Sequence, residues 1–79
     1  MNINEKIQDI IINKISDAQV TVSNMGGRHF NLTVTTQEFV GKNTLAKHKL
    51  VLSAIAPLMS GPGAPVHAID SLETMLPTA

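Results

Sequence analysis

The chain has 79 residues, 43% of them hydrophobic and 15% charged, and its six basic side chains balance its six acidic ones. This composition is too apolar for a disordered chain, and the length suits one small domain over residues 1–79. The neutral formal charge argues against a protein that coats nucleic acid, because phosphate neutralisation supplies most of the affinity of such proteins.

The chain contains no cysteine, so it offers neither a disulfide nor a thiolate of its own for catalysis or metal binding. Its first residues, MNINEKIQDI, lack the basic and then apolar pattern of a signal peptide. No apolar run approaches the roughly 18 residues of a membrane span. We therefore expect a soluble protein in the cytoplasm.

The first element in the chain is a predicted amphipathic helix over residues 3–16. Its apolar stripe has helical spacing and consists of isoleucines: Ile3, Ile7, Ile10, Ile11 and Ile15. Asn2, with Glu5 three residues later, fits a capping box at its start.

Two strands in a hairpin are predicted next. Apolar and polar residues alternate in AQVTVS (18–23) and in HFNLTVT (29–35), which is typical of half-buried strands. The intervening segment, Asn24 to Arg28, contains the turn signal NMGG and is expected to be the hairpin loop.

The second half of the chain predicts a helix and a third strand. Phe39 and Val40 are expected to plug the core ahead of a helix over residues 44–59, in which Pro57 marks a kink or a second helix from about Ala56. The apolar face expected for this helix consists of Leu45, His48, Val51, Leu52, Ala54, Ile55, Leu58 and Met59. After the loop SGPGAP, VHAIDSL (66–72) predicts a strand, and ETMLPTA a frayed tail.

This order of elements brings two histidines together. A strand, a helical crossover and a further strand form a βαβ unit, in which the two strands run parallel. Because neighbouring strands are about 4.8 Å apart, residues that begin parallel neighbours lie side by side. His29 begins the second predicted strand and His67 the third, so we expect both to cluster with the hairpin loop at one edge of the sheet.

Several motifs, in this order, resemble the BolA-like proteins. They are an HF strand start (29–30), FVGK (39–42), KHK (47–49), VHAI (66–69) and a Thr74 to Pro77 segment. The resemblance covers nearly the whole chain. It implies a protein with both helices and strands, broadly α/β and more narrowly α+β. The implied fold is αββααβ and similar to that of class II KH domains. A three-stranded mixed sheet packs on helices in this fold.

The resemblance also implies a binding module and not an enzyme. BolA-like proteins pair with monothiol (CGFS-type) glutaredoxins, with or without a bridging [2Fe–2S] cluster, and act in iron–sulfur trafficking and iron regulation. The family's cluster-ligating histidine corresponds to His67, and a second ligand, His or Cys, comes from the hairpin loop. The loop position that holds Cys in some members is Gly26 here, which leaves His29 as the nearby histidine.

This resemblance defines the predicted site. Without cysteine, the thiolates of a shared cluster have to come from the glutaredoxin and its glutathione, and the isolated chain is expected to be a monomer without cofactor. A histidine ligand raises the potential of such a cluster and makes it labile to protonation. Two alternatives stay open. In the first, His67 is a partly buried strand residue whose nitrogens are satisfied by backbone or water, and His29 is a solvent-facing strand residue. In the second, both bind zinc or another borderline metal as a weak site.

A second hypothesis belongs to a different class, because some BolA-like proteins are described as DNA-binding transcriptional regulators. The basic segment Lys42, Lys47, His48 and Lys49 would then be a nucleic-acid face. The alternatives are a solvated helix face or a docking surface for an acidic partner. No catalytic constellation is visible, since strand alternation is expected to turn His67 and Asp70 to opposite faces.

Overall fold

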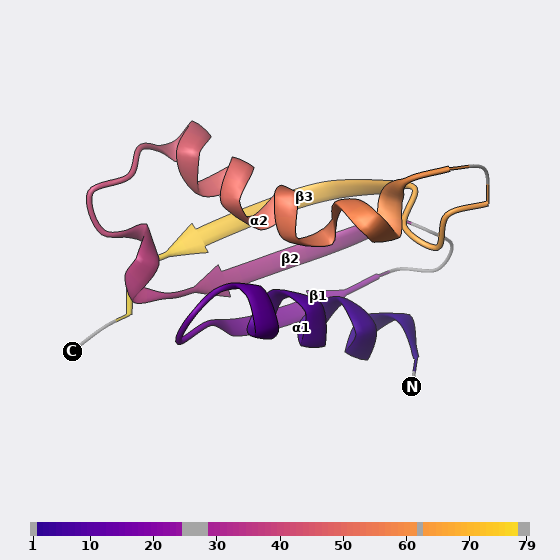
Figure 1. Cartoon of the computed structure of the whole chain (residues 1–79), viewed down its shortest axis with the longest axis horizontal. Helices are drawn as coiled ribbons and strands as arrows, with labels where there is room; N and C mark the ends of the chain where they lie inside the picture. Colours follow the sequence, from indigo (N-terminus) through magenta and orange to yellow (C-terminus); the bar gives the residue numbers. More distant parts are fainter. Residues whose placement is uncertain (1, 25–28, 62, 78–79) are drawn as a thin grey trace.

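A computed structural model describes residues 2–24, 29–61 and 63–77 of the chain. Its elements, in chain order, are α1 (Ile3–Lys14), β1 (Gln19–Ser23), β2 (His29–Thr35), the short 3₁₀ helix η1 (Gln37–Phe39), α2 (Thr44–Met59) and β3 (Ala68–Met75). Both α-helices lie on the same face of a three-stranded sheet, with α1 against β1 and α2 against β3 (Figure 1). The predicted α+β fold, with a mixed sheet packed on helices, is confirmed.

Helix α1 begins and ends where local hydrogen bonds dictate. The Asn2 side chain caps it by accepting the Glu5 N–H at 2.9 Å, as the capping pattern predicted. The helix ends at Lys14, two residues before the predicted end, because Ile15 already has an extended backbone. Asp17 then turns the chain toward β1 with a φ of 61°, a left-handed conformation that aspartate tolerates better than most residues.

The sheet has the predicted topology, in the order β1-β2-β3. β1 and β2 are antiparallel, with Val20 opposite Val34, which confirms the hairpin. β2 and β3 are parallel, as a βαβ unit requires. Residues 25–28 of the predicted hairpin loop lie outside the described residues.

β3 differs from the predicted third strand at both ends. It begins at Ala68 rather than Val66, and it continues through Glu73, Thr74 and Met75, where a frayed tail was predicted. These last residues pair with the end of β2, and Thr74 is half-buried opposite Val34. The strand is longer because β2, in the centre of the sheet, needs backbone partners along its whole length.

Helix α2 is a single helix, so the second helix predicted from about Ala56 is absent. Pro57 lies in the last turn with its side chain exposed. The helix continues because a proline here removes only one N–H, the one that would bond to the Ser53 carbonyl.

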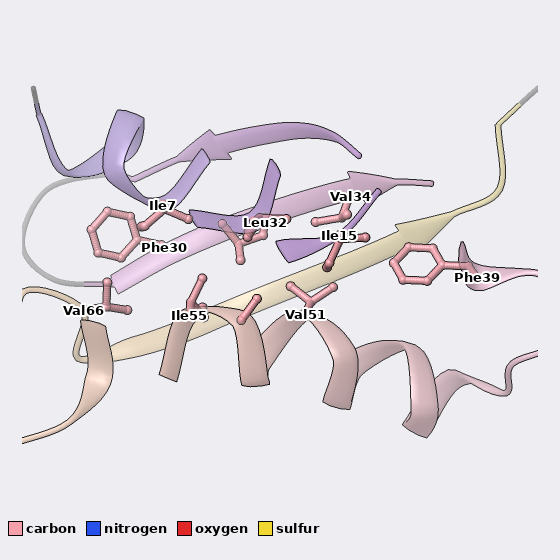
Figure 2. Packing of buried hydrophobic residues seen from close by; sticks show 11 residues of the cluster. Ile7, Ile15, Phe30, Leu32, Val34, Phe39, Val51, Ile55 and Val66 are labelled. Atoms are coloured by element: carbon pink, nitrogen blue, oxygen red, sulfur yellow. The ribbon is translucent and has the colours of Figure 1, made fainter. Parts of the chain in front are cut away.

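The core lies between the sheet and the helices (Figure 2). The fully buried positions include α1 residues, the inner face of β2, Phe39 and the middle of α2: Ile7, Ile11, Ile15, Phe30, Leu32, Val34, Phe39, Val51, Ala54, Ile55 and Val66. None of the helices in the described ranges is both long and apolar enough to cross a membrane.

The prediction that Val40, Leu45 and Leu52 lie in the core is wrong. Val40 is 62% exposed, because η1 ends at Phe39 and the chain turns outward there. Leu45 and Leu52 are also exposed, since α2 is rotated so that Val51, Ala54 and Ile55 face the sheet. Apolar residues surround most of α2, so their spacing alone left its orientation open.

Candidate functional site

His67 lies between the end of the α2–β3 loop and the first residue of β3. Val66 before it is 1% exposed, and its N–H donates to the Leu58 carbonyl at 3.1 Å. Ala68 after it pairs with His29. His67 itself is exposed and lies before β3, so it is not the partly buried strand residue that was one interpretation of the sequence. Both neighbours fix its backbone while its ring stays in solvent.

His29 is the first residue of β2, on the sheet face that the helices leave uncovered. Phe30 beside it is buried against the core, and alternation along the strand directs His29 the other way. Its side chain is 52% exposed. The His29 and His67 ring centroids are 5.2 Å apart with an interplanar angle of 53°. The predicted proximity of the two histidines is thus confirmed, and their role as ligands stays a prediction.

Asp70 completes this cluster, which we call the histidine edge (His29, His67 and Asp70). Oδ1 of Asp70 lies 3.0 Å from Nδ1 of His29. This contact was not predicted, because alternation was applied only to Asp70 and His67, and His67 lies before the first residue of β3. β3 also has a bulge: Phe30 pairs with Ile69 and Asn31 with Ser71, which leaves Asp70 as an extra residue between them.

The histidine edge carries two imidazole side chains and one carboxylate. Within the described residues, no three or more His, Cys, Asp or Glu side chains form a group that could hold a metal ion. Two imidazoles supply half of the four ligands of a tetrahedral site. The position at Gly26, where the resemblance places a loop ligand, lies outside the described residues. The described chemistry is therefore that of a half-site, open to solvent, to which another molecule would bring the remaining ligands.

Residues 47–49 of the basic segment lie in the first half of α2, away from the start of β3 (Figure 1), and Lys42 lies before the helix. Lys42 and Lys49 are exposed, while Lys47 and His48 are half-buried. At 3.6 residues per turn, Lys47 and Lys49 lie about 200° apart around the helix. The structure thus spreads Lys47, His48 and Lys49 around α2 and places Lys42 ahead of it, and nucleic-acid binding by these residues stays a prediction.

The fold and the exposed histidines define the class of this protein, and a family model defines its family. The architecture is that of a small α+β domain with a mixed three-stranded sheet and an exposed histidine pair at one sheet edge. A family model described as "BolA-like protein" matches residues 4–78. The chain therefore belongs to the BolA-like family, as its motifs indicated.

Solved structures agree with this assignment. A BolA protein homologue from Coxiella burnetii is 29% identical, with a TM-score of 0.79 and coverage of 98% of this chain and 94% of that one. A Bol-like protein from Babesia bovis is 28% identical, with a TM-score of 0.74 and coverage of 98% and 87%. BolA1 from Arabidopsis thaliana shares the fold at 17% identity, with a TM-score of 0.81 and coverage of 98% and 94%. A search of curated protein sequences finds no match.

Proposed function

We propose that this BolA-like protein is a non-catalytic partner of a monothiol (CGFS-type) glutaredoxin and helps to ligate a bridging [2Fe–2S] cluster through His67, in iron–sulfur trafficking or iron regulation. The observation that carries the proposal is the exposed His29–His67 pair, with ring centroids 5.2 Å apart, in a chain of the BolA-like family. Family membership supports the kind of partner, and the pair supplies the donor atoms.

The donor set fits such a cluster. Imidazole nitrogens replace two thiolates at one iron of Rieske-type [2Fe–2S] centres, so a histidine pair is an established ligand set for this cofactor. The chain has no cysteine, so the thiolates come from the glutaredoxin and its glutathione. When bound, the cluster supplies the redox and transfer chemistry, and this chain supplies neutral nitrogen ligands that raise its potential.

Each ligand has its own support in the fold. Val66 and the Leu58 carbonyl anchor the backbone just before His67, so its ring is presented from a fixed point. Phe30 does the same for His29 from inside the core. We assign His67 as the principal ligand and His29 as the second one.

The test is a titration of the apo protein with a cluster-loaded monothiol glutaredoxin, followed by visible circular dichroism. The wild-type protein is expected to change the cluster spectrum, and His67→Ala to abolish that change. His48→Ala is the matched control, because it removes the remaining histidine, which lies on α2, and should leave the change intact. A spectral change that survives in His67→Ala with wild-type amplitude would refute the proposal.

A further inference from the structure

We propose that Asp70 is a positioning residue that holds the His29 ring in one tautomer, with the proton on Nδ1, and so presents Nε2 as the metal-binding nitrogen. This inference rests on the proposed function, in which His29 is the second ligand. It adds a residue that acts on the cluster through His29.

The contact itself defines the tautomer. Oδ1 of Asp70 lies 3.0 Å from Nδ1 of His29. An ionised carboxylate only accepts hydrogen bonds, so Nδ1 has to be the donor and carry the proton. A neutral imidazole has a single N–H, which leaves the lone pair of His29 on Nε2. A metal bound by His29 is then bound through Nε2.

Asp70 lies on the same uncovered face of the sheet as His29, because it follows Ile69, which packs against the core. Here Asp70 is the unpaired residue between the Phe30–Ile69 and Asn31–Ser71 pairs. The next pair is held by a hydrogen bond of 3.0 Å between the Ser71 hydroxyl and the Asn31 side chain, which fixes the register beyond the bulge. The bulge leaves Asp70 outside the pairing of β2 with β3, and its carboxylate contacts a candidate ligand.

The contact contributes little to the stability of the fold. The His29 and Asp70 side chains are 52% and 58% exposed. Exposed pairs of this kind are worth about 0–1 kcal/mol, because water screens them. A carboxylate on the outer nitrogen of a ligating histidine, by contrast, fixes the orientation of the ring and makes the other nitrogen a better donor. The arrangement is therefore better suited to presenting a ligand than to holding the sheet together.

The first test reads the tautomer directly in the ¹⁵N-labelled apo protein. A long-range ¹H–¹⁵N spectrum, recorded well above the pH range in which an imidazole is protonated, distinguishes the two ring nitrogens. In the wild type, His29 is expected to show a protonated Nδ1 and an unprotonated Nε2. In Asp70→Ala the proton is expected to move mainly to Nε2, the form that a neutral histidine prefers in water.

The matched control is Glu73→Ala, which removes an exposed carboxylate from the same strand, opposite Thr33. It should leave the His29 tautomer unchanged, and the backbone amides of β3 report whether either variant disturbs the strand. A wild-type His29 with its proton on Nε2 would overturn the inference. So would an Asp70→Ala spectrum with an unchanged tautomer.

The second test asks whether the tautomer of His29 affects the affinity for the cluster. Loss of an outer carboxylate partner of a ligating histidine costs about 10–100-fold in metal affinity. The midpoint of the titration with cluster-loaded glutaredoxin should therefore rise by about that factor in Asp70→Ala and stay unchanged in Glu73→Ala. If the tautomer changes and the midpoint does not, Asp70 is not a positioning residue. The two failures are distinguishable: a wild type with the expected tautomer but no cluster spectrum refutes the proposed function and leaves the Asp70–His29 contact standing.

Discussion

The two ends of the β2–β3 pair differ in how far their side chains are exposed to solvent. At the histidine edge, where both strands begin, His29, His67 and Asp70 are all exposed. At the opposite end, where both strands finish, Thr36 and Phe39 are buried, and we call this the threonine end. Figure 2 shows Phe30 and Val66 in the core at one end and Phe39 at the other.

The threonine end is held by a network around one buried hydroxyl. The Thr36 side chain donates to the Ser16 carbonyl at 2.6 Å and accepts the Glu38 N–H at 3.1 Å. The Thr36 N–H donates to the Met75 carbonyl at 3.2 Å, and the Glu38 carboxylate accepts the Ser16 N–H. These bonds tie the end of α1, η1 and the end of β3 to one point.

At the histidine edge, only the residues flanking the histidines are buried. Phe30 and Val66 carry the packing, and the functional side chains project away from it. Packing of the core and presentation of the histidines are thus separated along the sheet. Substitutions at the threonine end should change the free energy of unfolding, whereas substitutions at the histidine edge should change binding and leave stability nearly unaltered.

The largest effect is expected for Phe39→Ala at the threonine end. Phe39 is 1% exposed, and truncation of a buried phenylalanine costs about 3–5 kcal/mol in the free energy of unfolding. Urea denaturation followed by far-ultraviolet circular dichroism measures it, since the chain has no tryptophan. Val40→Ala is the control, because Val40 is the next residue and is exposed. Phe39→Leu extends the measurement if the alanine variant is unfolded in buffer. Equal stability of the Phe39 and Val40 variants would contradict the assignment of Phe39 to the core.

A smaller loss is expected for Thr36→Val, which keeps the shape of the side chain and removes its hydroxyl. The Ser16 carbonyl and the Glu38 N–H, which are partly buried, then lose their partner, and the loss is expected at the lower end of the roughly 1–3 kcal/mol that an unsatisfied buried group costs. Thr33→Val makes the same chemical change on the uncovered sheet face and should cost less. If Thr36→Val and Thr33→Val unfolded at the same urea concentration, the hydrogen bonds of Thr36 would not be a source of stability.

Next comes Asn43→Ala at the start of α2. The Asn43 side chain accepts the Ala46 N–H at 2.8 Å, and loss of such a cap costs about 1 kcal/mol. Asn43→Ser retains a capping oxygen and should be close to the wild type in thermal unfolding. Identical losses in both variants would show that the cap hydrogen bond is not the cause.

The proximity of the histidines could be predicted from the sequence, because it follows from topology alone. His29 and His67 are far apart along the chain, yet parallel neighbouring strands begin at the same edge of a sheet. The isoleucine stripe of α1 and the alternation in β2 were equally informative, since each has one face buried and one exposed. The family motifs then added the kind of partner.

The contact between Asp70 and His29 was not predicted, because alternation was applied only to Asp70 and His67, and His67 lies before β3. One extra residue in β3 changes which face every side chain after Asp70 takes, and a bulge leaves no clear mark in a strand as polar as AIDSLETM. The orientation of α2 was hidden for a related reason. Its apolar residues surround the helix, so only packing against the sheet distinguishes Val51 from Leu52. Both misses concern side-chain direction and not the existence of an element.

The smallest effect on stability is expected at the histidine edge, and it is the sharpest test of the comparison. Substitution of His29, His67 or Asp70 by alanine should change the free energy of unfolding by at most about 0.5 kcal/mol, as for other exposed sites. Val66→Ala is the matched control, since Val66 is adjacent to His67 and buried. Removing its two methyl groups should cost about 1.6 kcal/mol or more. The same samples in the glutaredoxin titration should give the reverse ranking, with His67→Ala inactive and Val66→Ala active wherever it is folded. A large loss of stability in His67→Ala would mean that its ring holds the strand entry in place, and packing and presentation would then not be separate at this edge.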